Sequence, residues 1–354
     1  MTRLRRATRD TFRSLGNRNY RLYFWGQTVS VSGTWMQGVA QAWLVLQLTG
    51  SGTVLGLTTA LQFLPILLGG PLAGVVADRV DKRRLLLVTQ SVAALLAVAL
   101  GVLTATGLVT LWMVFALAFA FGCVVAFDNP TRQSFVLEMV GPDDVANAVT
   151  LNSVVINAAR VVGPAVGGLL IAGVGIAACF LLNGLSYLAV IAALAAMRPA
   201  ELTRPRSAAR GKGQLREGLR YVWATPDLRV PLLVMAVVGT LAYEFHVVLP
   251  LLAREAFGGG ARTYGIMSSM MGVGAVVGGL ATARRSTPTA SGLLRAACAF
   301  GAVILALAAA PTLGVALAVL VVTGGASIVF IATANATLQL HAAPAMRGRV
   351  MALW

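Results

Sequence analysis

The stretch GPLAGVVADRVDKRR (70–84) joins two long apolar segments through a short cluster of charged residues. No Asp, Glu, Lys or Arg occurs from Leu22 to Ala77, and none occurs from Leu85 to Phe127. A helix that crosses a membrane needs roughly 20 apolar residues, so each run has room for two such helices. A third run of this kind extends from Ala296 to Leu340. These runs predict an all-α, polytopic membrane protein.

Composition and charge support this class. Of the 354 residues, 58% are hydrophobic and 11% are charged, whereas a soluble domain has about 25% charged residues. The net charge of +16 is gathered in the N-terminal arm, after the second apolar segment and in the middle of the chain. Alternate loops, at 49–53, 104–110 and 173–175, have no basic residue. By the positive-inside rule we expect a cytoplasmic N-terminus rather than a nucleic-acid partner.

The apolar runs predict an order of helices and two halves. The helices are expected at 22–47, 53–77, 85–106, 109–128, 146–172, 175–197, 230–253, 263–283, 291–310 and 312–338. A basic arm (1–21) thus precedes a first half (22–197), a connector (198–229) and a second half (230–354). The connector includes an amphipathic pattern at 212–223, which predicts a helix at the cytoplasmic surface.

Repeated glycines indicate that the two halves are related. Gly56, Gly69 and Gly70 recur 209 residues later as Gly265, Gly278 and Gly279, and such spacing is typical of an internal repeat. The basic ending PAMRGRVMALW (344–354) predicts a further helix pair. We therefore expect about ten helices in a C-terminally incomplete chain, with the second half incomplete at about four.

The opening stretch resembles the loop between helices two and three of the major facilitator superfamily. The residues that match it are Gly74, Asp78, Arg79, Lys82 and Arg83. Asp81 stands where that family usually has glycine. In the family this loop latches the two halves in one state, and the extra carboxylate of Asp81 is expected to weaken such a latch.

A second stretch, RVVGPAVGG (160–168), is similar to the fifth-helix antiporter motif of the same superfamily. The matching residues are Gly163, Pro164, Gly167 and Gly168. Together with the segments 19–51, 127–135 and 344–353, the chain looks like the bacterial efflux branch that includes enterobactin-exporter-like and macrolide-efflux-like transporters.

The resemblance implies a fold and a function. Members have twelve helices in two six-helix halves around a central cavity, in the bacterial inner (plasma) membrane. The expected function is export of a small amphipathic molecule, drug or siderophore, by proton antiport and alternating access. The expected partners are the lipid bilayer, a small-molecule substrate and protons, for a monomeric protein. It would not be an enzyme, and neither a cofactor nor a metal is expected.

The first helix has a polar stripe that is a candidate for lining the cavity. Its members share one helical face because they are spaced by three or four residues; they are Gln27, Ser30, Thr34, Gln37 and Gln41. Hydrogen bonding between helices is the alternative. Asn157 and Arg160 on the fifth helix are further cavity candidates. Arg160 would bind an anionic substrate group or form a structural ion pair, and the sequence leaves both open.

Acidic residues within the apolar segments are candidates for proton coupling. Glu244 lies in the expected helix 230–253, and intramembrane carboxylates are functional candidates by default. Pairing of Glu244 with Arg160 is the structural alternative. His246 lies about 200° around that helix from Glu244, so we expect it to bond a neighbouring helix. Asp128, just before Asn129 and Pro130, is expected at the cytoplasmic end of the fourth helix, where it orders the loop with Arg132.

Two other functions stay open at this point. The chain has no nucleotide-binding loop of the G-x-x-x-x-G-K-S/T type, so ATP coupling within it is not supported. A non-transporting membrane sensor or scaffold, or an inactive truncated fragment, is the alternative from another class. An importer of a nutrient is disfavoured only by the antiporter-like motif.

Overall fold

The computed structural model of the chain describes residues 12–203, 214–282, 290–343, 346, 350, 351 and 353. The side chains of 71, 75, 78, 214–216, 218, 282 and 290 lie outside this description. Every regular element in the described part is helical, which confirms the all-α prediction. The chain divides into two compact units: Met1–Ser207 with Leu249–Ile266, and Ala208–Val248 with Met267–Trp354.

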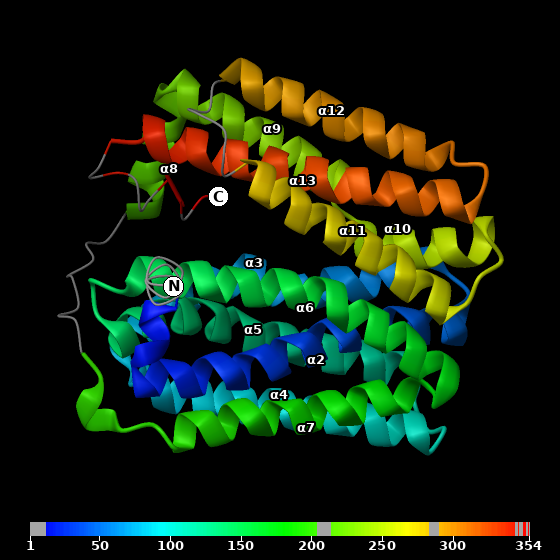
Figure 1. Ribbon diagram of the computed structural model, residues 1–354, viewed down its shortest axis with the longest axis horizontal. Coiled ribbons are helices and arrows are strands. Elements are labelled where there is room, and N and C mark those ends of the chain that lie inside the picture. Colours follow the sequence, from blue (N-terminus) through cyan, green and yellow to red (C-terminus); the bar gives the residue numbers. More distant parts are fainter. Residues whose placement is uncertain are drawn as a thin grey trace, which may run out of the picture. The chain divides into compact units, whose positions relative to one another are not determined.

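Long helices build the first unit (Figure 1). They are α2 (Arg18–Thr49), α3 (Gly52–Arg79), α4 (Lys82–Ala105), α5 (Leu111–Val140), α6 (Val145–Gly173) and α7 (Ile176–Ala195). Short 3-10 helices flank them at Arg13–Gly16 and Pro199–Glu201. α2 packs against both α6 and α7, α3 packs against α5, and α4 packs against α5 and α7.

Polar side chains fix the starts of several helices. Asn17, Ser51 and Asp81 precede α2, α3 and α4, and each accepts a hydrogen bond from the backbone amide three residues later. Such N-caps satisfy amides that have no partner within the helix. α2 ends at Thr49, and the following Gly50, with a left-handed φ of 64°, closes the last turn. Asp81 is therefore the N-cap of α4. Comparison with the family loop, which usually has glycine at this position, did not predict this role.

α5 is longer than the sequence indicated. The expected helix ended at residue 128, but α5 continues through Pro130 to Val140. Proline lacks an amide hydrogen and crowds the preceding turn, so it is usually read as the end of a helix. Here the hydroxyl of Thr131 donates to the carbonyl of Phe127 at 2.6 Å and the helix goes on. The predicted end was wrong by 12 of the 30 residues of the helix, and Asp128 lies inside it rather than at its end.

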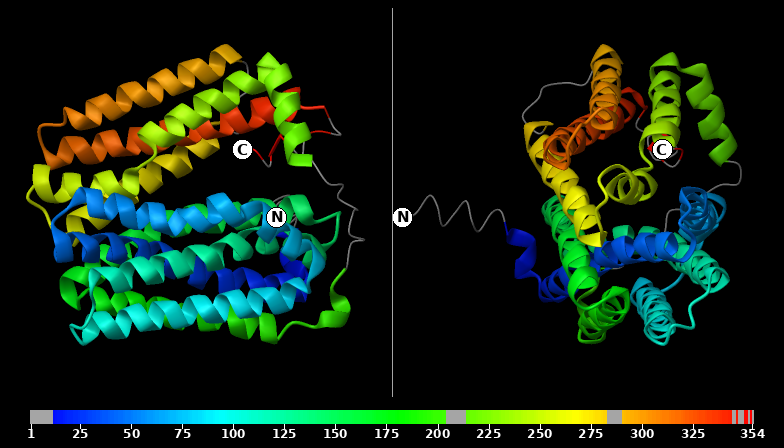
Figure 2. Two further views of the ribbon diagram at one scale, coloured as in Figure 1. Left: turned by 180° about the vertical axis from the view of Figure 1, so that it is seen from behind. Right: turned by 90° about the vertical axis from the view of Figure 1, so that its right-hand side faces the viewer.

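The second unit and its junctions contain the remaining helices. They are α8 (Gln214–Ala224), α9 (Pro226–Ala242), α10 (Phe245–Leu251), a π-helix (Leu252–Ala256), α11 (Ala261–Thr282), α12 (Ala290–Ala308) and α13 (Leu313–His341). α12 and α13 run side by side, and both contact α9 (Figure 2). The helix expected in the connector is present as α8.

The helix expected at 230–253 is broken. α9 ends at Ala242 and α10 begins at Phe245, with Tyr243 and Glu244 between them. The hydroxyl of Tyr243 donates to the backbone carbonyl of Ser327 on α13 at 2.9 Å. The Tyr243 ring also packs on Phe300 of α12, with ring centroids 5.4 Å apart. These contacts hold the break in place, and hydropathy alone carries no sign of them.

Nine helical segments in the described part are long and apolar enough to cross a membrane, and one of them is the interrupted stretch Pro226–Ala256. α2 is not among them although it has 32 residues. Its polar stripe, which includes three glutamines, lowers its mean hydropathy below that of the other long helices. The prediction of a polytopic helical membrane protein is confirmed.

Glycine contacts repeat between the two units. A Cβ atom on Gly122 of α5 would overlap the carbonyl oxygen of Gln62 on α3. A Cβ atom on Gly324 of α13 would overlap the carbonyl oxygen of Met271 on α11. Gln62 and Met271 are 209 residues apart, the same offset as the glycine echo in the sequence. In both helix pairs a glycine of one helix therefore lies against a backbone oxygen of the other, although the two glycines are 202 residues apart rather than 209.

Candidate functional site

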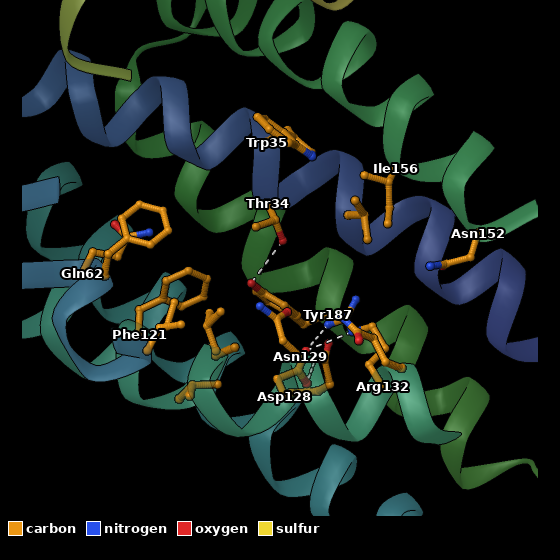
Figure 3. Close-up of a pocket in the computed structure, with 18 residues that line it drawn as sticks. Thr34, Trp35, Gln62, Phe121, Asp128, Asn129, Arg132, Asn152, Ile156 and Tyr187 are labelled. Carbon is orange, nitrogen blue, oxygen red and sulfur yellow. Dashed lines mark hydrogen bonds and ion pairs between the residues drawn. The ribbon is translucent and has the colours of Figure 1, made fainter. Parts of the chain in front are cut away.

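A cavity of about 470 Å³ lies within the first unit and is lined by eighteen residues (Figure 3). Its aromatic residues are Trp35, Phe63, Phe121 and Tyr187. Its amide side chains are Gln62, Gln90, Asn129, Gln133 and Asn152. Ligand pockets combine an apolar lining with a few polar groups in this way. The cavity can therefore receive a small molecule that has both apolar and polar parts.

An ion pair on α5 borders the cavity. Arg132 Nε donates to Asp128 Oδ2 at 3.0 Å, and a second guanidinium nitrogen bonds the same oxygen. Thr89 Oγ1 and Gln90 Nε2 on α4 donate to Asp128 Oδ1 at 2.8 and 2.7 Å. Arg132 also donates to Gln27 on α2. The pair is thus internally neutral and connects three helices.

Thr34 is the member of the polar stripe on α2 that lines this cavity. Its hydroxyl oxygen lies 3.3 Å from that of Tyr187 on α7, which also lines the cavity (Figure 3). Ser30 is buried within the unit. The stripe therefore reaches the cavity at one position of the five that the sequence suggested.

The glutamines of the stripe make hydrogen bonds to other helices. Gln37 accepts a hydrogen bond from Asn183 Nδ2 on α7 at 2.6 Å. Gln41 donates to Gln62 on α3 at 2.9 Å. Gln27 accepts from the arginine of the α5 ion pair. These contacts correspond to the alternative interpretation, in which polar groups join helices in an apolar surrounding.

Arg160 lies against the ring of Trp35, which lines the cavity. Its guanidinium carbon is 5.1 Å from the centroid of Trp35, a cation–π distance. Asn157, one turn earlier, donates to the backbone carbonyl of Ser153 at 2.8 Å. Neither Asn157 nor Arg160 is among the lining residues.

Glu244 and His246 lie at the break between α9 and α10, and both are exposed in the second unit. The sequence placed them on one continuous helix and separated them by its rotation. That argument is wrong because Glu244 is not in a helix. Glu244 instead lies between Tyr243 and Phe245, whose rings both pack near Phe300.

Comparison with known proteins identifies the family. A family model described as Transmembrane secretion effector matches residues 10–354. The chain belongs to this family of the major facilitator superfamily. The resemblance drawn from the loop and glycine motifs is confirmed, and the chain is a member of a transporter family rather than an enzyme.

Individual relatives of this major facilitator chain bear names of the expected kinds. It is 25% identical over 246 residues to the Staphyloferrin A transporter of Staphylococcus aureus, which covers 69% of this chain and 62% of that protein. It is 23% identical over 274 residues to Macrolide efflux protein A of Streptococcus pyogenes, with coverages of 74% and 66%. The chain thus spans less than two thirds of the length of these relatives.

A solved structure supports the major facilitator fold. The chain is similar to a bacterial homolog of the human lysosomal transporter Spinster, in an inward-facing and unoccupied conformation. The TM-score is 0.72 at 18% identity, over 95% of this chain and 78% of that one. At this identity the likeness concerns the fold alone.

The antiporter-like motif of this family member brings α6 into backbone contact with two helices. A Cβ atom on Gly163 would lie 2.6 Å from Cβ of Trp35 on α2. One on Gly168 would lie 2.9 Å from the carbonyl oxygen of Ala261 on α11. The remaining motif residues, buried on the same helix, are Pro164 and Gly167. The motif is therefore part of the packing of the first unit.

The loop motif between α3 and α4 fastens α4 to its neighbours. Lys82 Nζ pairs with Glu138 Oε1 on α5 at 2.6 Å. Arg83 donates to the carbonyls of Leu194 and Ala195 at 2.6 and 3.0 Å. Because these carbonyls end α7, a cation there also favours the helix dipole.

The other loop-motif residues have different surroundings. Arg79 ends α3 and is exposed. A Cβ atom on Gly74 would meet no described atom within 4 Å, so close packing does not explain this glycine in the first unit. The side chain of Asp78 lies outside the described part of the chain.

Sequence reasoning missed the residues that form the polar side of the cavity. Asp128 was expected at the end of a helix, ordering the adjoining loop with Arg132. Neither Gln90 and Tyr187 of the lining nor Thr89, which donates to Asp128, was singled out. The available signal was the spacing of Asp128 and Arg132, because residues four apart face each other on a helix. It was overlooked because Pro130 lies between them.

Proposed function

We propose that this chain is a secondary active exporter of a small amphipathic molecule, drug or siderophore. It moves its substrate out of the cell by alternating access and proton antiport. It lies as a monomer in the bacterial plasma membrane with its N-terminus in the cytoplasm. The observation that carries the proposal is the amphipathic cavity inside a polytopic unit of this family.

The lining of the cavity supports an amphipathic substrate. Aromatic rings provide apolar surface and stacking for a ligand. Amide side chains such as Asn129 and Asn152 offer hydrogen bonds without a net charge. The names of the two relatives, one a Staphyloferrin A transporter and one a macrolide efflux protein, are consistent with a substrate that has both kinds of surface.

Glu244 is the proposed proton carrier. Its carboxylate is exposed at a break between helices, where proton exchange does not require a helix to unfold. The oxygens of Asp128, in contrast, are already occupied by donors from Thr89, Gln90 and Arg132. The driving force from the membrane potential is about 2.3 kcal/mol per proton and 100 mV.

The two family-like motifs have proposed roles in the transport cycle. The loop at Gly74, Asp78, Arg79, Lys82 and Arg83 latches one conformation. The contacts of Lys82 and Arg83 support this role, because they hold the start of α4 rigid. The glycine motif on α6 keeps the first unit closely packed while the cycle proceeds.

Transport in inside-out membrane vesicles tests the proposal. With an imposed pH gradient, vesicles that contain the chain should accumulate a fluorescent drug or a labelled siderophore, and Glu244→Gln should abolish the dependence on the gradient. Glu255→Gln is the matched control, since Glu255 is an exposed carboxylate in the π-helix just after α10. Full gradient-driven transport by Glu244→Gln would disprove the coupling role.

The same experiment separates the competing functions. Uptake into right-side-out vesicles, with none into inside-out vesicles, would show an importer. Binding of the probes with transport in neither direction would indicate a sensor, a scaffold or an inactive fragment.

A further inference from the structure

The two charged groups of the cavity neutralise each other. Among the eighteen lining residues, all of which the structure describes, only Asp128 and Arg132 carry a charge (Figure 3). Arg132 Nε donates to Asp128 Oδ2 at 3.0 Å, and a second guanidinium nitrogen bonds the same oxygen. The lining of this cavity therefore has both signs of charge but no net charge.

Arg132 is the more exposed member of the pair. Its side chain is 21% exposed, whereas that of Asp128 is 6% exposed. Asp128 Oδ1 accepts hydrogen bonds from Thr89 and Gln90 of α4, so the carboxylate is held from two sides. The guanidinium thus covers Oδ2, and removal of either member would leave the charge of the other without its partner beside the cavity.

An ionic ligand would have no free counter-charge in this lining. A charged group that leaves water pays a large desolvation cost unless it is paired. If the ligand instead displaced one member of the pair, the displaced charge would lose its own partner. An uncharged ligand pays neither cost, and rings such as Trp35 and Phe121 give it apolar contact.

We propose that the Asp128–Arg132 pair sets the charge selectivity of the cavity. The cavity takes uncharged amphipathic molecules and excludes organic cations and anions of similar shape. This inference rests on the proposed export function and narrows its substrate class. Arg132 already occupies the place on Asp128 that a cationic ligand would take, and Asp128 likewise occupies Arg132.

Three matched probes test the preference by equilibrium dialysis against the purified full chain in detergent at neutral pH. They are 1-naphthylmethanol, 1-naphthylmethylammonium and 1-naphthoate, which share one ring system and are uncharged, cationic and anionic. Binding is counted above the uptake by micelles without protein. We expect the alcohol to bind most tightly. Equal or tighter binding of either ion to the unmodified chain would overturn the proposal.

Two variants should shift the preference in opposite directions. Asp128→Asn frees the Arg132 guanidinium, and it should raise the affinity for 1-naphthoate relative to the alcohol by about 10- to 150-fold, the range expected of a hydrogen bond to a charged group. Arg132→Ala uncovers Asp128 Oδ2 and leaves space beside it. This variant should favour the ammonium probe by a similar factor. Folded variants that keep the preference for the alcohol would refute the role of the pair.

Arg13→Met is the matched control for overall charge. Arg13 pairs with Asp144 outside the lining, and its removal changes the net charge of the chain as Arg132→Ala does. The control should keep the preference for the alcohol. An equal shift toward the ammonium in both variants would assign the selectivity to the net charge of the protein and overturn the proposal.

The outcome is separable from that of the transport assay. The comparison of the three probes uses the unmodified chain, so a variant that fails to fold leaves the test intact. Selective binding of the alcohol without transport would support the cavity chemistry and refute export. Gradient-driven transport of the ammonium or the carboxylate probe would support export and refute the charge selectivity.

Discussion

Replacing Arg132 with methionine should destabilise the protein through the carboxylate that it leaves behind. The Asp128 side chain is 6% exposed and the Arg132 side chain 21%, so water can do little to replace the lost partner. Asp128 would keep only the two neutral donors from α4. Breaking a buried ion pair by removing one partner costs about 3–5 kcal/mol in the free energy of unfolding.

Adding Asp128→Asn to Arg132→Met should recover most of this loss. The asparagine oxygen still accepts from Thr89 and Gln90, while the uncompensated charge is gone. We expect the double variant to be only about 1–2 kcal/mol less stable than the original chain, which gives a large coupling energy between the two positions.

The stabilities can be measured by denaturant unfolding in detergent micelles, followed by circular dichroism at neutral pH. The original chain, both single variants and the double variant form a complete cycle. If the double variant is as unstable as Arg132→Met alone, the ion pair is not what holds these helices, and the reasoning fails.

Three further substitutions test the packing of each unit. Gly163→Ala should lower the free energy of unfolding by about 1–3 kcal/mol, because its Cβ would crowd α2; Gly173→Ala in the same helix, with no described atom within 4 Å, should be neutral in the same unfolding assay. Arg83→Gln should cost about 1 kcal/mol by releasing the end of α7, whereas Arg84→Gln, an exposed neighbour, should leave the midpoint unchanged. Tyr243→Phe should lose about 1 kcal/mol with its bond to α13; an unchanged midpoint would mean that the aromatic contacts alone hold the break.

The fold could be predicted from the sequence because it depends on long apolar runs. The all-helical class and most helices follow from segments such as 85–127, which contain no charge. The helix ends that were wrong depend on particular contacts. α5 continues past Pro130, where the hydroxyl of Thr131 bonds a backbone carbonyl of the same helix. The helix expected at 230–253 is interrupted at Tyr243, whose hydroxyl bonds a backbone carbonyl of α13. Hydropathy is a property of single residues and therefore does not reflect either contact.

The candidate site was harder to predict because it depends on hydrogen bonds between side chains of different helices. The stripe on α2 was found correctly as a set of polar residues on one face. Which of them line a cavity depends on their partners, and Gln37 is engaged by Asn183 from far along the chain. Asp128 and Gln90 become a site only when α4 and α5 are side by side. The assignments of Glu244 and Arg160 stay predictions.

The glycine contacts at Gln62 and Met271 depend on the backbone and not on the side chain at either position. In both helix pairs a glycine meets a backbone oxygen, so the contact takes no account of the side chain at the partner position. In the first pair that side chain is an amide that lines the cavity, and in the second it is a thioether. Two helix pairs joined in this manner can each change the side chains of the interior without a change in how the helices pack.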